Sequence, residues 1–387
     1  MSAIAFEIPA ELREIVAGLE RFIRAEVIAR HEKHAELLDD PRRRFGPDGR
    51  YAPAVVDIIR DVRIAASAAG YFNLCVPVSM GGLGQGYLAY YVAWESINRL
   101  CGPHHWLGTF ALSHWAFGPS VVLEQLTPQA RDRVLGPLVS GRESMCFGLS
   151  EPGAGSDATM IQTRAVPDGD GWRITGRKMW TTNVTFADWI IAFAITDPAR
   201  AAARRGGISG FLVPTSAPGF RMQRVTLLQG EIGGVEGEST LDDVGRVYNA
   251  ARAVGLARWA LEKAVRYSGE RVAFGVPIAE HQGVAFPLAE SAMEVHAAHL
   301  MGLNASMLLD RGHKAVKELS MAKAYAVEVC LRAVDRAIQT HGGMGLTNEV
   351  GLVHAYNTLR IVNIADGTNE ILRRTIFQQL AKGDLDL

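Results

Sequence analysis

The chain has 387 residues and a formal net charge of −1, with 48% hydrophobic and 21% charged residues. This balance leaves enough apolar material for a substantial core, and it offers no overall charge that would attract nucleic acid or an anionic membrane. The length predicts two or three domains, or one large multi-layer unit.

The cysteine pattern and the N-terminal residues predict the cellular compartment of the protein. The four cysteines are scattered without the CxxC spacing of a zinc site, so we expect free thiols in a reducing compartment and no metal ion. The first residues lead into an acidic, helix-like stretch, without the basic and apolar regions of a secretory signal. No apolar run approaches the ~20 residues that span a bilayer. We therefore expect a cytoplasmic protein that binds neither nucleic acid nor membrane.

Helical periodicity runs through the first third of the chain. Apolar residues recur there at the spacing of one helix face. The predicted helices cover 11–30, 53–69, 87–100, 106–125 and 128–140. We assign residues 1–142 to an N-terminal all-α domain.

The middle of the chain has the residue pattern of β-strands. Short runs of β-branched and aromatic residues lie between turn residues, at 145–149, 172–175, 189–196, 208–214 and 220–225. The sequence Asp-Gly-Asp-Gly at 168–171 predicts a hairpin, because Asp-Gly pairs tolerate positive φ. We assign 143–244 to a small antiparallel β domain.

Long helical segments return in the last third, near 246–271, 281–311 and 314–340. Long helices joined by short connections predict an antiparallel bundle over 245–387. The order α, then β, then α, without βαβ alternation, argues against a Rossmann domain. The predicted class is therefore α+β, with a β domain between two helical domains.

A carboxylate near the C-terminus indicates a catalytic function. The segment reads Ile-Ala-Asp-Gly-Thr-Asn-Glu-Ile over 364–371. A carboxylate on a Gly-hinged turn before a helix can be aimed by the backbone at a carbon acid, which is the work of a general base. The segment resembles the Glu-Gly-Thr-x-Glu-Ile stretch of the acyl-CoA dehydrogenase superfamily, with Asp366 in place of the glutamate base. The competing interpretation is that Asp366 only caps the helix predicted over 369–380, where the helix dipole favours a carboxylate.

Two further segments carry the same resemblance. Residues 147–157 read Phe-Gly-Leu-Ser-Glu-Pro-Gly-Ala-Gly-Ser-Asp, and such a strand end followed by Pro and Gly exposes backbone amides to a polar ligand. Residues 178–183, Lys-Met-Trp-Thr-Thr-Asn, are similar to the family's second flavin motif, with a threonine at the second of the three contacting positions in place of the commoner aliphatic residue. The resemblance implies FAD contacts from Phe147, Leu149, Ser150, Ser156, Trp180, Thr181 and Thr182.

The third flavin element is split in the sequence. The Arg-x-x-Phe-Gly run at 271–275, with its downstream Gln, resembles an element that in the family reaches the FAD of a neighbouring subunit, and a guanidinium fork suits a diphosphate. The Gly-containing run at 339–345 has a related role there, and we assign its histidine, His341, no part in proton transfer. The resemblance implies a homo-oligomer, a tetramer, and FAD contacts from Arg271, Phe274, Gln282, Gln339, Gly342, Gly343, Thr368 and Glu370.

The resemblance implies a fold, a reaction and partners. The middle domain would be an antiparallel β-barrel and the C-terminal domain a four-helix bundle. The reaction would be FAD-dependent α,β-dehydrogenation of an acyl-CoA thioester with a medium, branched or cyclic acyl group, with Asp366 as base and hydride transfer to flavin N5. The backbone N–H of Asp366 would polarise the thioester carbonyl. Electrons would pass to an electron-transfer flavoprotein. Substrate contacts are implied for Ser156, Asp243, Arg246 and Gly367.

Alternatives remain open at the sequence level. Nitroalkane oxidases share the fold and also use Asp as base, so an oxidase that deprotonates a small carbon acid is the second hypothesis. The connection over 225–244 is shortened, so Asp243 and Arg246 form a CoA-contacting pair, or the run Leu-Asp-Asp-Val at 241–244 is the last strand and the CoA-contacting helix start is missing. That shortening also keeps a third hypothesis, a non-catalytic subunit of a hetero-oligomer. The aromatic, histidine-containing stretch at 104–117 lines an acyl cavity or simply packs in the core.

Overall fold

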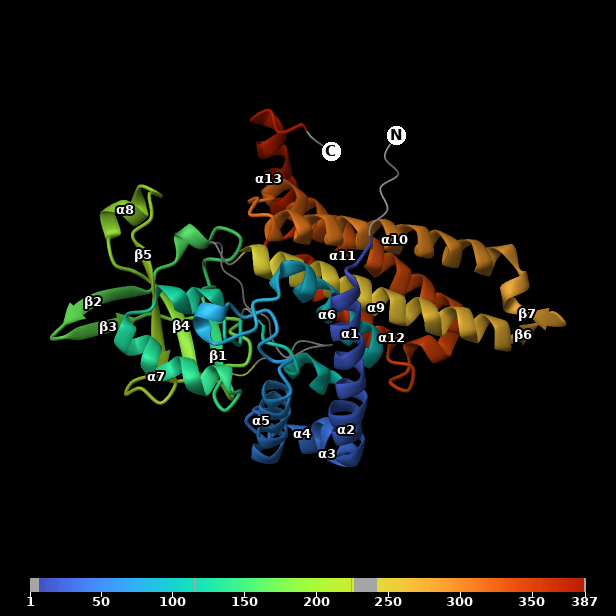
Figure 1. Ribbon diagram of the computed structural model, residues 1–387, viewed down its shortest axis with the longest axis horizontal. Helices are drawn as coiled ribbons and strands as arrows, with labels where there is room; N and C mark the ends of the chain where they lie inside the picture. The colour runs from blue at the N-terminus through green and yellow to red at the C-terminus, as the bar shows by residue number, and fades with distance from the viewer. Residues whose placement is uncertain (1–6, 115, 224, 226–241, 386–387) are drawn as a thin grey trace.

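The computed structural model describes residues 7–114, 116–223, 225 and 242–385, apart from the side chains of 242 and 243. Two helical regions enclose a β domain along the sequence, and this order confirms the predicted α+β class. Figure 1 shows the β domain at one end of the molecule and the long helices extending to the other end. No described helix is both long and apolar enough to cross a membrane.

The N-terminal region is helical, as predicted. The first helix continues through a π-helical stretch, Ile23–Ile28, into the next. The α-helices are α1 (Ala10–Phe22), α2 (Ala29–Lys33), α3 (Ala35–Leu38), α4 (Pro41–Arg44), α5 (Pro53–Ala68), α6 (Gly86–Cys101) and α7 (Pro128–Val139).

The predicted helix over 106–125 is wrong. Its described residues form two short 3₁₀ helices, Trp106–Phe110 and Val121–Gln125, joined by an irregular loop. The loop contains Pro119, which has no N–H to donate and disfavours the helical conformation of the residue before it. Gly118 accordingly has a φ of +69°, far from helical values. Trp115 lies outside the described residues.

The β domain contains five described strands. β2 was not predicted, and only one of its residues, Ala165, is buried. The strands are β1 (Met145–Gly148), β2 (Arg164–Asp168), β3 (Gly171–Thr175), β4 (Trp189–Ile195) and β5 (Ile208–Pro214), and a short helix α8 (Pro198–Ala202) precedes β5. The predicted hairpin is present, with Asp168 opposite Gly171 in the β2–β3 pair. The predicted strand at 220–225 is wrong for its described residues, which pair with no described strand.

The strand directions require one correction. β2–β3 and β4–β5 are antiparallel as expected, but both β1 and β2 run parallel to β4, with Met145 opposite Trp189 and Arg164 opposite Ile195. The long segment between β1 and β4, which includes the β2–β3 hairpin, supplies the crossover that a parallel pair needs. The pairings of the described strands form an open sheet, in which β4 contacts β1, β2 and β5, and they do not close a barrel.

The C-terminal region is a bundle of long helices around α9. The helices are α9 (Asp242–Glu270), α10 (Gln282–Asp310), α11 (Val316–His341), α12 (Leu352–Ile364) and α13 (Asn369–Ala381). A small hairpin of β6 (Val272–Ala273) and β7 (Val276–Pro277) joins α9 to α10 at the end of the molecule far from the β domain (Figure 1). α12 was not predicted from the sequence.

Two hydrophobic clusters meet at the start of α9. The larger one fills the space between α6, α9, α10 and α11, and a second one lies under β1 and β4. Val244 packs against both clusters. The first turns of α9 therefore lie where the helical bundle contacts the β domain, and this contact positions the candidate site.

Candidate active site

The turn between α12 and α13 presents Asp366. Its φ is +53°, and that of Gly367 is +80°. Positive φ is tolerated best by glycine and, among other residues, by Asn and Asp, so a short carboxylate suits this position. The cap of α13 is Thr368, whose hydroxyl accepts a hydrogen bond from the Ile371 N–H at 3.3 Å. Helix capping therefore does not account for the Asp366 carboxylate.

The Asp366 carboxylate faces α9. The side-chain amide of Asn249 donates a hydrogen bond to its Oδ2. Burial raises the pKa of Asp366 above its ordinary value, while the Lys323 cation, the Asn249 hydrogen bond, Arg246 and Arg252 act in the opposite direction without cancelling the rise. A carboxyl group whose pKa is displaced toward neutral pH is better matched to proton abstraction than an ordinary aspartate.

The arginines around Asp366 are themselves enclosed. Arg246 is 5% exposed, and burial lowers the pKa of Arg252 to about 10 although Asp366 favours its charged form. Both lie on α9, as does Asn249. Asn249 follows Val244 by five residues, a rise of about 7.5 Å along the helix. The carboxylate is thus close to the junction with the β domain. The side chain of Asp243 lies outside the described residues.

A cavity of about 360 Å³ opens beside this junction. It is lined by Val244 at the start of α9, by Tyr87 and Tyr90 of α6, and by parts of the loops at 75–84 and 113–121. Tyr90 contacts Trp94, which in turn meets Tyr248 with ring centroids 4.7 Å apart. Burial raises the pKa of Tyr248, and Tyr90 and Asp366 add to the rise, so Tyr248 lies near both the cavity and the carboxylate.

The aromatic residues of 104–117 pack mainly in the core. Trp106 stacks on Tyr51 with ring centroids 5.8 Å apart, and Phe110 packs against Phe117. His104 contacts Trp259 and the backbone of Val350. None of the described aromatic residues of this stretch lines the cavity, which receives Ser113 instead.

The first two flavin motifs are joined by direct bonds. The N–H of Met179 donates to the carbonyl oxygen of Ser150 at 2.9 Å. Lys178 donates to the carbonyl oxygen of Leu149 at 3.0 Å and to the Glu151 carboxylate at 2.7 Å. The structure therefore brings together two segments that the sequence could only place near each other by resemblance.

Glu151 is the buried centre of this contact. Its carboxylate also accepts hydrogen bonds from the backbone N–H groups of Gln162, at 2.6 Å, and Thr163, at 3.0 Å. Burial pushes the pKa of Glu151 up, but the hydrogen bonds from Lys178, Thr163 and Gln162 outweigh it and hold the pKa below its ordinary value. Sequence reasoning assigned no role to Glu151 or Lys178, although both lie inside the quoted motifs.

The remaining residues of these motifs border the same region. Phe147 is buried in β1 and Leu149 packs with Ala154, whereas Ser156 is exposed at the end of the loop. Trp180 has a φ of +60° and is 46% exposed. Thr181 and Thr182 are half-buried.

The third flavin element lies at the opposite end of the molecule (Figure 1). Arg271 and Gln282 are exposed beside the β6–β7 hairpin, and Phe274 is 97% exposed. From Val244 to the end of α9 the helix rises about 40 Å, a distance longer than an extended FAD molecule. One FAD therefore cannot contact both ends of the same chain.

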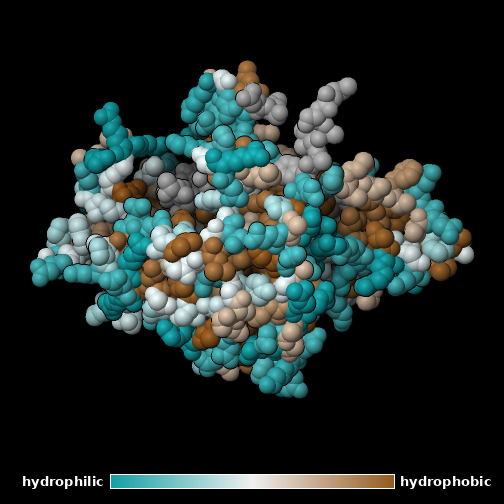
Figure 2. Space-filling model, viewed as in Figure 1, coloured by the Kyte–Doolittle hydropathy of each residue, from teal (hydrophilic) through white to brown (hydrophobic). Residues whose placement is uncertain are grey.

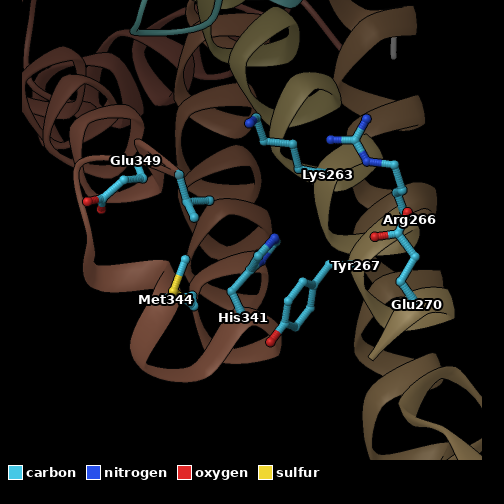
Figure 3. Close-up of a pocket in the computed structure, with 8 residues that line it drawn as sticks. Lys263, Arg266, Tyr267, Glu270, His341, Met344 and Glu349 are labelled. Atoms are coloured by element: carbon cyan, nitrogen blue, oxygen red, sulfur yellow. The ribbon is translucent and has the colours of Figure 1, made fainter. Parts of the chain in front are cut away.

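The end of α11 joins this distal group. Gln339, Gly342 and Gly343 are exposed there. His341 donates a hydrogen bond from Nδ1 to the Ala337 carbonyl oxygen at 2.8 Å, and its ring stacks on Tyr267 of α9 with centroids 4.5 Å apart. Figure 3 shows both rings beside a pocket of about 170 Å³ whose charged lining residues are Lys263, Arg266, Glu270 and Glu349. His341 is thus a structural residue.

Comparison with known families covers nearly the whole chain. Three family models match: the N-terminal domain of acyl-CoA dehydrogenase over 9–142, its middle domain over 146–244 and its C-terminal domain over 239–381. The chain belongs to the acyl-CoA dehydrogenase family. It is an FAD-dependent oxidoreductase that acts on CH–CH groups of acyl-CoA substrates.

Individual relatives agree with this assignment. The caffeyl-CoA reductase–Etf complex subunit CarC of Acetobacterium woodii is 31% identical, over 81% of this dehydrogenase and 87% of its own length. Human mitochondrial short-chain specific acyl-CoA dehydrogenase is 34% identical, over 81% and 80%. Among solved structures, acyl-CoA dehydrogenase from Geobacillus kaustophilus superposes with a TM-score of 0.80 at 25% identity, over 97% of this chain and 99% of its own.

The residues of this acyl-CoA dehydrogenase fit FAD at the junction of its domains. The Thr182 hydroxyl is inaccessible to solvent, and within the described part of the chain it has no hydrogen-bond partner. An unsatisfied buried hydroxyl costs about 1–3 kcal/mol, which a bound ligand can recover. When bound, the flavin would meet this hydroxyl, the Trp180 indole and the Leu149–Ser150 backbone.

Proposed function

We propose that this acyl-CoA dehydrogenase uses Asp366 as its general base and acts on a medium, branched or cyclic acyl group. The observation that carries the proposal is the position of the Asp366 carboxylate. It is bonded by Asn249, surrounded by cationic side chains and placed at the junction that also borders the 360 Å³ cavity. The cap of α13 is Thr368, so helix capping does not explain a partly buried carboxylate there.

Proton abstraction follows from this geometry. Asp366 takes the proton from the α-carbon of the thioester, the β C–H bond breaks, and a double bond forms between the two carbons. The acceptor for the hydride that leaves the β-carbon would be supplied by the N5 of FAD when it is bound. Among the described residues none accepts a hydrogen bond from the Asp366 N–H, so this group is available to polarise the thioester carbonyl.

The shorter side chain of the proposed base affects which acyl group the enzyme can use. Asp is one methylene shorter than Glu, and a displacement of about 1 Å can cost ~100-fold in rate. The substrate must therefore approach the turn more closely than it would approach a glutamate. The cavity of about 360 Å³ beside α6, which Tyr87 and Tyr90 help to line, is the proposed site for the acyl group.

CoA recognition is assigned to four positions. Arg246 lies in the first turns of α9 and brings positive charge toward Asp366. Ser156, exposed on the flavin loop, and Gly367, beside the base, complete the substrate contacts together with Asp243. For Asp243, whose side chain lies outside the described residues, the role rests on the family motif alone.

The distal motif supports a homo-oligomer, a tetramer, in which FAD is shared between chains. Arg271, Phe274, Gln282, Gln339, Gly342 and Gly343 lie about 40 Å from the junction along α9, so they would serve the FAD of a neighbour. Thr368 and Glu370 would contact FAD from the α13 start. An electron-transfer flavoprotein is the proposed acceptor, supported by the relative that is named as a subunit of an Etf complex.

An anaerobic bleaching screen tests the proposal. Purified holoenzyme is mixed with a panel of straight, branched and cyclic acyl-CoA esters, and flavin absorbance is followed without oxygen. We expect bleaching by at least one branched or cyclic ester, loss of bleaching in Asp366→Asn, and a changed order of preference in Asp366→Glu. Full activity of Asp366→Asn would exclude this base, and oxygen consumption with nitroethane would favour the oxidase hypothesis.

A further inference from the structure

Lys323 of α11 is a fully buried lysine aimed at the turn that carries Asp366. Its exposed fraction is 0%. The ammonium group donates hydrogen bonds to three consecutive carbonyl oxygens: those of Ala365, of Asp366 at 3.0 Å and of Gly367 at 2.6 Å. A lysine ammonium has three N–H donors, so one side chain binds the backbone on both sides of the base.

These three bonds fix the peptide planes around Asp366. In a trans peptide the carbonyl and the N–H point in opposite directions. The Ala365 carbonyl shares its plane with the Asp366 N–H, so holding that oxygen against α11 directs the N–H away from α11. The same holds for the Asp366 carbonyl and the Gly367 N–H. The positive φ values of Asp366 and Gly367 are the backbone conformation that brings all three oxygens to one point.

Docking of α13 on α11 does not depend on this lysine. The Asn369 amide donates to the Ala324 carbonyl at 3.1 Å. Arg373 pairs with Glu328 at 2.6 Å. The two helices are therefore held together by side chains outside the turn, and Lys323 acts on the turn itself.

Lys323 is also a charge beside the base. The groups that face the Asp366 carboxylate are Arg246, Tyr248, Asn249 and Arg252 from α9 and Lys323 from α11. Of the influences that lower the pKa of Asp366 against the effect of burial, the Lys323 cation is the largest. Without this cation, burial would raise the pKa of Asp366 further, so the carboxyl group would hold its proton to a higher pH.

We infer that Lys323 is a positioning residue for the reaction, which sets the direction of the Asp366 carboxylate and of the Asp366 N–H by binding the three carbonyl oxygens of the turn. The inference rests on the proposed role of Asp366 as base. Lys323 would act through these backbone bonds and through its charge.

Lys323→Met tests this, because methionine is also unbranched and only one atom shorter, and it removes both charge and donors. We expect normal FAD content and visible spectrum, a bleaching rate at saturating substrate that is lower by about 100-fold, and little change in KM. We also expect the acid limb of the pH–rate profile to move to higher pH, which a purely structural role would not cause. Arg373→Met, which removes only a docking contact, should stay within about twofold of the wild type.

Two further variants keep the inference open to refutation. Lys323→Gln retains two donors without charge and should recover part of the rate but not the pH profile, while Lys323→Arg should retain the profile. A folded, FAD-loaded Lys323→Met enzyme with wild-type rate and profile would overturn the inference. So would failure of all three variants to fold while Arg373→Met folds, since Lys323 would then be structural. If Asp366→Asn retains activity, the assignment of the base fails instead, so the two failures are distinct.

Discussion

The Nζ atom of Lys178 lies 2.7 Å from the Glu151 carboxylate and 3.0 Å from the carbonyl oxygen of Leu149. One side chain thus ties the loop that follows β1 to the segment that carries Trp180 and Thr182. Both members of the pair are nearly inaccessible to solvent, so the contact behaves as a buried ion pair. Together with the Met179–Ser150 backbone bond, the pair holds the two flavin segments in their relative position.

Lys178→Met should therefore destabilise the protein and weaken FAD binding. It leaves the Glu151 carboxylate buried without its cation, a change that costs on the order of 3–5 kcal/mol. Urea unfolding of the apoprotein and fluorescence titration with FAD measure the two effects. The double variant with Glu151→Gln should recover part of the loss, whereas Arg177→Met, at the exposed neighbouring position, should change stability by less than about 0.5 kcal/mol. A wild-type FAD affinity in Lys178→Met would contradict the prediction.

Proton abstraction should be lost at low pH, over a range set by Asp366. The carboxylate acts as base only when ionised, and its pKa is raised in the folded protein, chiefly by burial. The bleaching rate should then fall as pH drops through a value above 3.8, the ordinary pKa of an aspartate. Asn249→Ala removes a hydrogen bond that favours the ionised form, so its acid limb should lie at higher pH than that of the wild type. Stopped-flow bleaching across pH provides the measurement, and an unmoved limb in Asn249→Ala would count against the contact.

Phe274→Asp should dissociate the proposed oligomer and release FAD. The ring is 97% exposed at the distal end, and Figure 2 shows hydrophobic residues gathered over the adjoining helix α10, which exposes Phe286 and Met293. A charge at an apolar contact between chains leaves an unpaired carboxylate buried there. Sedimentation velocity and FAD content report the result. Val166→Asp places the same charge on the exposed hairpin of the β domain and should leave both unchanged. An undisturbed oligomer in Phe274→Asp would show that this end is not shared.

Thr182→Val should have opposite effects on the apoprotein and on FAD binding. Valine has nearly the shape of threonine, so it removes a buried hydroxyl that has no partner among the described residues, without opening a cavity. The apoprotein should become more stable by about 1 kcal/mol, while FAD affinity should fall by roughly tenfold because the proposed hydrogen bond to the flavin is lost. Thermal unfolding with and without FAD separates the two effects, and Thr182→Ser should resemble the wild type. Loss of stability in the apoprotein would show that the hydroxyl already has a partner.

Local sequence patterns predicted most of the helices and strands. Some of the predictions that were wrong are instructive. The long helices α9, α10 and α11 have strong periodicity and appear where expected. The stretch at 106–125 has similar apolar content, but Pro119 and the preceding glycine break it. The sheet direction could not be predicted either, because β1 and β4 pair across an intervening hairpin. The domain limits at 142 and 244, and the roles of individual site residues, stay predictions.

The sequence by itself determined the family, the flavin motifs and the position of Asp366 in the base segment, because these depend on which residues follow one another along the chain. Only the tertiary structure decided what surrounds that carboxylate. Asn249 is 117 positions away from Asp366, and Lys323 reaches the turn from another helix. Such partners are chosen by the packing of α9 and α11 against the turn, and no local periodicity encodes which buried side chains meet there.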